Sequence, residues 1–169
     1  SIASFNVKNL IGADQEYYQF QKYTPEEYAW KADWLSEQLQ TMDADIVGFQ
    51  EIFDEAALRD VIAEADAEGI EANTAHIHGT NKRYRKKAIF RKLAYSPYTN
   101  AVLAFAPNLN DGAPGHRRPG LAIISRFGFV GEPEVIQDLS EDMIKWTGKS
   151  QEGNYVLHRL SRPILKVCV

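Results

Sequence analysis

Polar and apolar side chains alternate over residues 1–7, where Phe5 and Val7 fall on one side and Ser4 and Asn6 on the other. An alternation of period two with β-branched and aromatic residues predicts a β-strand. The following stretch, 8–23, is polar and aromatic without a regular period. We expect that stretch to form an irregular loop.

The clearest helix signal begins at Thr24. Thr24 and Glu27 have the spacing of a capping box, and Pro25 stands at the first helical position. Trp30 and Trp34 flank the apolar side of this helix, and we expect them to pack in the core or at its rim. The apolar side itself follows spacings of three and four residues and contains Tyr28, Ala32, Leu35, Leu39 and Met42.

Strand and helix patterns alternate along the rest of the chain. The apolar segment 45–50 predicts a buried strand. Asp54 is placed to cap a second helix, which we expect to end at Gly69 and to be followed by a weak strand over 70–77. The inward face of this helix would contain Leu58, Val61, Ile62 and Ala65, and further strands are predicted over 100–106, 120–125, 127–136, 155–160 and 163–169, with a Gly- and Pro-rich loop over 108–119.

This order of elements, with helices between the early strands and mostly strands afterwards, predicts an α/β or α+β layered sheet domain. A chain of 169 residues fits a single domain with a substantial core. The last strand candidate, 163–169, runs to the final residue without a turn or a polar tail. We therefore expect the fold to continue beyond Val169, or another chain to cover the exposed sheet edge.

The net charge of -4 argues against a protein that coats nucleic acid in general, but the charge is unevenly distributed. Residues 43–71 are acidic, with Arg59 as their only basic member, whereas residues 82–92 contain seven basic side chains and no acid. The basic segment is either a solvated surface or a phosphate-attracting one, on which Tyr84 and Phe90 could stack against bases.

No apolar run approaches the length of a membrane span, and the single cysteine, Cys168, cannot form an internal disulfide. These features predict a cytoplasmic protein without a membrane span. The chain begins at Ser1, so the sequence leaves open whether a leader peptide precedes it.

Three segments carry a family resemblance: SFNVKNL at 4–10, DADIVGFQEI at 43–52 and GLAIISRF at 120–127. Taken in this order they resemble the first signatures of the endonuclease/exonuclease/phosphatase superfamily, and SRPILKV at 161–167 is similar to an arginine-containing strand of its deoxyribonuclease-like members. The resemblance implies a layered α/β/β/α sandwich of the deoxyribonuclease I-like type. Residues 1–169 would form its N-terminal half and would be incomplete as a sandwich.

Glu51 directly follows an apolar strand, and a carboxylate at the carboxyl end of a strand faces the crevice where ligands bind in layered α/β folds. By resemblance Glu51 is a catalytic residue and the ligand of Mg²⁺, with Mn²⁺ or Ca²⁺ as alternative cations. The resemblance makes Asn6 its catalytic partner, which helps hold the metal and the attacked phosphate. The residues alone leave open that Glu51 is a surface glutamate and that Asn6 bonds to water.

Arg117 and Arg118 precede the strand at 120–125, where family members often carry a phosphate-contacting residue, and Arg162 aligns with an arginine of the deoxyribonuclease-like set. The planar guanidinium group of arginine can donate paired hydrogen bonds to phosphate oxygens. Solvent-exposed loop arginines are the alternative for the first two. Lys8 stands where apurinic-endonuclease-like sequences have an aspartate, which argues mildly against abasic-site repair. His116 and His158 match no catalytic histidine of the family.

The resemblance implies a magnesium-dependent phosphodiester hydrolase, and the basic segment favours a nuclease. The alternatives are a phosphatase or phosphodiesterase of small-molecule or lipid substrates, and a non-catalytic binding module. Family members carry an Asp-x-Asn pair and an Asp-His pair further along, and neither follows Val167 here. We therefore expect residues 1–169 alone to hydrolyse little.

Overall fold

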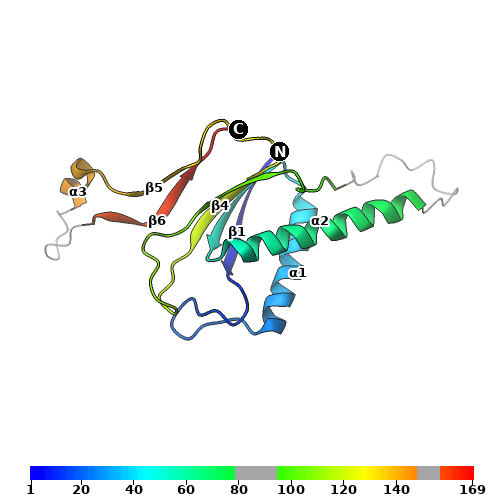
Figure 1. Cartoon of the computed structure of the whole chain (residues 1–169), viewed down its shortest axis with the longest axis horizontal. Helices are drawn as coiled ribbons and strands as arrows, with labels where there is room; N and C mark the ends of the chain where they lie inside the picture. Colours follow the sequence, from blue (N-terminus) through cyan, green and yellow to red (C-terminus); the bar gives the residue numbers. More distant parts are fainter. Residues whose placement is uncertain (79–94, 148–156) are drawn as a thin grey trace.

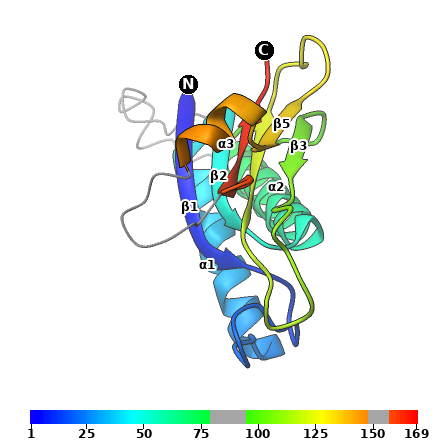
Figure 2. The same ribbon diagram turned by 90° about the vertical axis from the view of Figure 1, so that its left-hand side faces the viewer.

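A computed structural model describes residues 1–78, 95–147 and 157–169 of the chain. Figure 1 shows a four-stranded sheet with two long helices on one side and a small two-stranded sheet on the other. The same arrangement is seen from the side of the small sheet in Figure 2. This architecture confirms the predicted mixed α/β class. The basic segment 82–92 lies outside the described residues.

The larger sheet is built from the strands β1 (Ile2–Leu10), β2 (Ile46–Ile52), β3 (Val102–Ala106) and β4 (Gly120–Ser125). The strand order is β1-β2-β4-β3, so that β1 lies at an edge. β1 pairs with β2 in parallel, whereas β4 is antiparallel to both β2 and β3. The end of β2 therefore lies beside the beginning of β4. The strand predicted over 1–7 is observed, but it continues to Leu10.

Helix α1 (Pro25–Met42) connects the two parallel strands and begins with the predicted capping box. Thr24 Oγ1 accepts a hydrogen bond from the Glu27 amide at 3.2 Å, and the Glu27 carboxylate accepts one from the Thr24 amide at 2.9 Å. The predicted apolar face is buried at Ala32, Leu35 and Leu39. These side chains pack on the sheet.

The two tryptophans of α1 differ in their agreement with the expected core or rim placement. Trp30 is 73 % exposed and Trp34 is 46 % exposed. Trp34 still contacts the sheet edge, because its ring centroid lies 6.3 Å from that of Phe5. Trp34 therefore packs at the rim, as one of the two expected placements, whereas Trp30 faces solvent.

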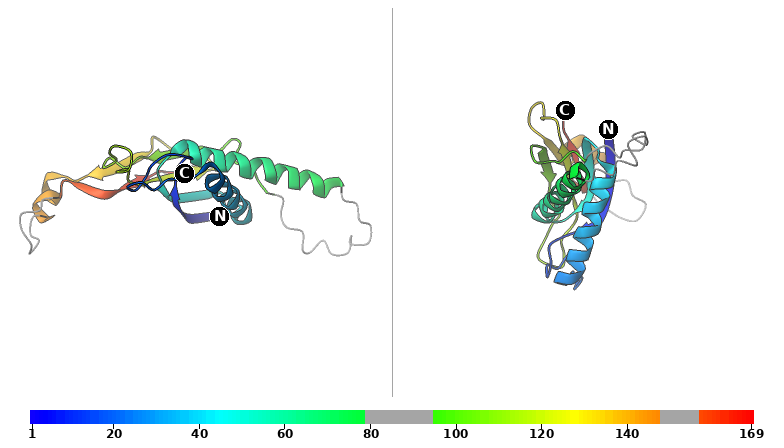
Figure 3. Two further views of the ribbon diagram at one scale, coloured as in Figure 1. Left: turned by 90° about the horizontal axis from the view of Figure 1, so that it is seen from below. Right: turned by 90° about the vertical axis from the view of Figure 1, so that its right-hand side faces the viewer.

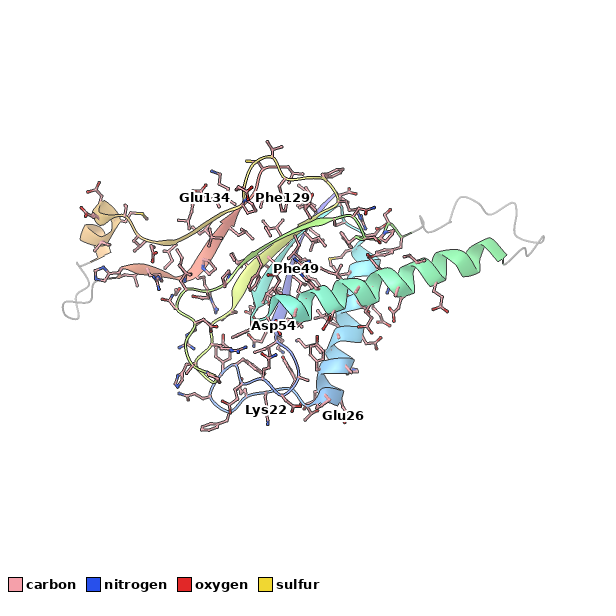
Figure 4. All side chains as sticks on the ribbon, viewed as in Figure 1. Lys22, Glu26, Phe49, Asp54, Phe129 and Glu134 are labelled. Atoms are coloured by element: carbon pink, nitrogen blue, oxygen red, sulfur yellow. The ribbon has the colours of Figure 1, made fainter. Side chains whose placement is uncertain are left out.

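Helix α2 (Glu55–His78) also covers this face of the sheet, with Asp54 as its cap: Asp54 Oδ1 accepts a hydrogen bond from the Ala56 amide at 3.0 Å. Figure 4 labels Asp54 at the start of the helix. The predicted inward residues are all buried, and they join Phe49 and the apolar side chains of α1 in the core: Leu58, Val61, Ile62 and Ala65.

The prediction that α2 ends at Gly69 is wrong, and so is the strand over 70–77, because the helix continues to His78. Gly69 has a packing role instead. A Cβ atom at this position would lie 2.1 Å from Cδ1 of Tyr95. The glycine therefore makes room for the Tyr95 ring, which is held by a 2.8 Å hydrogen bond from its hydroxyl to Asp66.

The small sheet pairs β5 (Glu134–Asp138) with β6 (Arg159–Lys166) in antiparallel fashion, and helix α3 (Glu141–Thr147) follows β5. Figure 3 shows this part projecting at the opposite end of the molecule from the far end of α2. The predicted strand over 127–136 begins later than expected. The candidates over 155–160 and 163–169 are only partly observed: residues 155–156 lie outside the described part of the chain, and β6 joins 159–160 to 163–166 and ends at Lys166. Its pairing with β5 is irregular around Pro163, which has no amide hydrogen to donate.

A buried polar network attaches the small sheet to the loop before β4. Asn108 Nδ2 donates to the backbone oxygens of Ser161 at 2.9 Å and Pro119 at 3.1 Å. Gln137 Nε2 donates to Asn108 Oδ1 at 2.7 Å. Asn108 is 3 % and Gln137 is 1 % exposed, so these bonds satisfy amides that would be costly to bury unpaired. The network fixes β6 beside the start of β4.

Candidate functional site

A pocket of about 220 Å³ opens where β2 ends and β4 begins. Two of its polar side chains are Asn6 from β1 and Glu51 from β2, and a third is Arg162 from β6. These residues are far apart in the sequence and were each predicted as site residues. The remaining lining residues are Gln50, Pro119, Gly120 and Leu121.

Glu51 owes its orientation to a bulge in β2. Strict alternation would place its side chain with Val47 and Phe49, both buried beneath the helices. The backbone of Glu51 is left-handed instead, with φ of 66°, and the pairing with β4 shifts between Gln50 and Ile52. The bulge resets the alternation, so that Glu51 lines the pocket while Ile52 returns to the core.

A left-handed backbone costs a residue with a Cβ atom about 1 kcal/mol. A strained residue of this kind persists when the surrounding structure holds it, and such residues cluster at functional sites. Here the strained residue is also the one that gives the pocket its carboxylate among the described residues. The bulge therefore favours a role for Glu51 beyond packing.

β1 is irregular at the same level. Its pairing with β2 shifts between Asn6 and Leu10, and the two intervening residues Lys8 and Asn9 are both left-handed, with φ of 52° and 61°. Asn6 Oδ1 accepts a hydrogen bond from the Lys8 amide at 2.8 Å, which fixes the Asn6 side chain. One lone pair of Oδ1 and the two donors of the amide nitrogen remain for a ligand.

Two side chains from outside the sheet bind the carbonyl oxygens of this Lys8–Asn9 turn. Lys31 Nζ of α1 donates to the Lys8 oxygen at 2.8 Å, and the Tyr23 hydroxyl donates to the Asn9 oxygen at 3.1 Å. Burial lowers the pKa of the Lys31 ammonium, and Lys8 acts in the same direction, whereas Glu51 acts in the opposite one. Burial also raises the pKa of Tyr23 far above its usual value, so its hydroxyl keeps its proton.

Arg162 is exposed and brings a positive charge to the pocket wall opposite the sheet. Its neighbour Ser161 is bound through its carbonyl oxygen to Asn108, which fixes the backbone on which Arg162 sits. The pocket thus combines a carboxylate, two amide side chains and a guanidinium. Such a set can hold a cation and an anion side by side.

Arg117 and Arg118 are not among the described residues that line this pocket. Arg117 donates to Gln15 Oε1 at 2.8 Å and lines a second pocket of about 370 Å³ together with Asp14, Glu16 and Lys22. Arg117 points to this second pocket because the 108–119 loop packs on the loop before α1, where the Gln19 amide donates to the Gly115 oxygen at 2.7 Å. The two predicted histidines, His116 and His158, are solvent-exposed.

Another group of acids lies between α1 and α2. The carboxylate oxygens of Asp33, Glu64 and Glu68 lie within 4.8 Å of one another. Glu68 accepts hydrogen bonds from Gln40 at 2.6 Å and from Ser36 at 3.3 Å. Burial, followed by repulsion from Glu68 and Asp33, raises the pKa of Glu64. Neither Asn6 nor Glu51 belongs to this group, and exposed acidic groups are common without an ion.

Gln50 was not singled out from the sequence, although it stands next to Glu51 in the signature string. Its Nε2 donates to Ser4 Oγ at 3.2 Å and to the Gly48 oxygen at 3.0 Å. These bonds hold the Gln50 side chain along the sheet, where it forms the floor of the pocket between Asn6 and Leu121. Its position directly before the carboxylate was the available signal.

Among known proteins, no family model matches this chain, and neither a curated protein nor a solved structure does so. Within the described residues, no helix combines the length and the apolar character that crossing a membrane requires.

Proposed function

We propose that this chain belongs to a magnesium-dependent phosphodiester hydrolase that acts as a nuclease, built as a deoxyribonuclease I-like sandwich. One observation supports the proposal most: Asn6, Glu51 and Arg162, taken from the sequence as metal and phosphate residues, line one pocket. The signature strings around them and the bulge that orients Glu51 add to this support.

The donor set of the pocket fits Mg²⁺. This ion takes hard oxygen ligands and keeps several of its waters, so one carboxylate and the amide oxygens of Asn6 and Gln50 are a sufficient set. When bound, the cation would neutralise charge that develops on the phosphate. Glu51 and Asn6 would hold it, and Arg162 would bind and orient the phosphate oxygens. The apolar Leu121 and Pro119 would limit the access of water to this side.

Removal of the metal tests this function. In the natural protein that contains these residues, we expect hydrolysis of single- and double-stranded DNA that is lost with EDTA and returns with added Mg²⁺. Bis(p-nitrophenyl) phosphate and a lipid phosphodiester serve as comparison substrates. Faster cleavage of either one would replace the nuclease with a small-substrate or lipid phosphodiesterase. Mg²⁺ binding without hydrolysis would indicate a non-catalytic module, and EDTA-resistant cleavage would contradict the proposal.

Arg162→Ala is expected to weaken the binding of inorganic phosphate in the presence of Mg²⁺ about tenfold, or ~1.4 kcal/mol, because a charge-assisted bond is lost. Isothermal titration calorimetry measures this change. Arg118→Ala is the matched control, because its side chain does not line the pocket, and it should leave the affinity unchanged. An equal loss of phosphate affinity in both variants would mean that the affinity depends on the overall positive charge of the protein and that Arg162 does not contact the phosphate.

A further inference from the structure

The Lys8–Asn9 turn is a costly element that the strand pairing does not explain. Lys8 and Asn9 are consecutive left-handed residues, and this conformation is unfavourable for a residue with a Cβ atom, more so for lysine than for asparagine. Three residues of β1, Val7 to Asn9, stand opposite Glu51 alone on β2. The two irregularities face each other, so the turn in β1 and the bulge in β2 form one unit at the mouth of the pocket.

Three side chains stabilise this turn through hydrogen bonds. The first is Asn6, a pocket residue, whose Oδ1 accepts a hydrogen bond from the Lys8 amide. The other two are Lys31 and Tyr23, whose donors bind the Lys8 and Asn9 oxygens. Lys31 Nζ also lies 5.3 Å from the centroid of the Tyr23 ring, so the two donors support each other. The turn is therefore attached to α1 as well as to the sheet.

We propose that Lys31 is a positioning residue of the cation site. Its ammonium holds the Lys8–Asn9 turn, and the turn keeps the Asn6 side chain beside Glu51. The inference rests on the proposed function in that it takes Mg²⁺ as the cation. It goes beyond that function because Lys31 does not line the pocket and is not a ligand.

The sign of the effect separates positioning from simple charge. Lys31 is a cation that interacts with Glu51, so by charge alone its removal would make the site more attractive to Mg²⁺. If Lys31 acts by holding the turn, its removal would weaken Mg²⁺ binding although a repelling charge has gone. The two explanations thus predict opposite changes in affinity.

The test is calorimetric titration of Mg²⁺ into Lys31→Met, Lys31→Arg and the unchanged natural protein. We expect Lys31→Met to raise the Mg²⁺ dissociation constant about tenfold, the lower end of the loss seen when a residue supporting metal ligands is removed. Lys31→Arg keeps a charged donor and should recover most of this loss. Mg²⁺ binding by Lys31→Met that is unchanged or tighter would overturn the inference.

Lys22→Met is the control for charge, because it removes a lysine of the neighbouring loop that lines the second pocket, and it should leave Mg²⁺ affinity unchanged. Circular dichroism checks that each variant is folded. If Lys31→Met does not fold, Tyr23→Phe removes the other donor and should weaken Mg²⁺ binding in the same direction; unchanged binding would then overturn the inference. Glu51→Gln separates the two proposals. If Glu51→Gln leaves Mg²⁺ binding intact, the proposed function fails. If Glu51→Gln weakens Mg²⁺ binding but Lys31→Met does not, the proposed function stands and only the role of Lys31 fails.

Discussion

Replacing Glu51 with glutamine is expected to weaken Mg²⁺ binding on the order of 100-fold, equivalent to about 2.7 kcal/mol. The amide has the same shape as the carboxylate but carries no charge, and Mg²⁺ binds through charged oxygen ligands where it can. Glu51 supplies the carboxylate of the pocket among the described residues, so no neighbour there can replace it. Titration calorimetry with Mg²⁺ gives the affinity.

Glu51→Gly extends this test to the backbone. Glycine adopts a φ of 66° without a Cβ penalty, so this variant should lose Mg²⁺ binding and gain about 1 kcal/mol in the free energy of unfolding without Mg²⁺. Urea denaturation measures the gain. A strained residue that can be replaced with a gain in stability is retained for function. Glu51→Gly that binds Mg²⁺ normally, or that is clearly destabilised, would contradict this account of the bulge.

Gly69→Ala is expected to lower the free energy of unfolding by about 2 kcal/mol, because the added methyl group overpacks the core. At an ordinary position inside a helix the same change would be stabilising by about 1 kcal/mol. The opposite sign arises from the Tyr95 ring, whose Cδ1 would lie 2.1 Å from the new Cβ atom. The melting temperature should fall by about 6 °C for a chain of this size.

A second variant tests the cause of this loss. In a Tyr95→Leu background the aromatic ring is gone, so Gly69→Ala should cost much less than it does in the unchanged protein, as a double-mutant cycle would show. The Tyr95 ring is also held through Asp66, so the single variant Tyr95→Leu has its own cost, and the cycle removes that cost from the comparison. Equal costs in both backgrounds would mean that the ring is not the obstacle.

The elements with a strong local pattern could be predicted from the sequence. The capping box at Thr24 and the apolar stripe of α1 depend on neighbours within a few turns, and both are observed. The same holds for the buried strand β2 and the cap at Asp54. The prediction that α2 ends at Gly69 was wrong, because a glycine late in a helical pattern usually marks the end of the helix. Here a tyrosine distant in the sequence decides its role.

The candidate site was predictable in its residue types but not in its geometry. Asn6, Glu51 and Arg162 stood in recognisable strings, and they lie together. The bulge at Glu51 could not be predicted, because alternation along β2 would have turned the carboxylate into the core. Arg117, like Arg162, was predicted to bind phosphate from a short sequence string alone. Its place in a second pocket follows from the contact between two loops, which no short pattern encodes.

The parallel pairing of β1 with β2 has a consequence for how the protein matures during synthesis. These strands and α1 are consecutive along the chain, and Asn6 pairs with Gln50, so this unit can assemble before the later strands β3 to β6 have been synthesised. β6, which carries Arg162, is made much later. If the proposed function holds, a nascent chain would bind a divalent ion first, and would bind phosphate through Arg162 only once translation has passed β6.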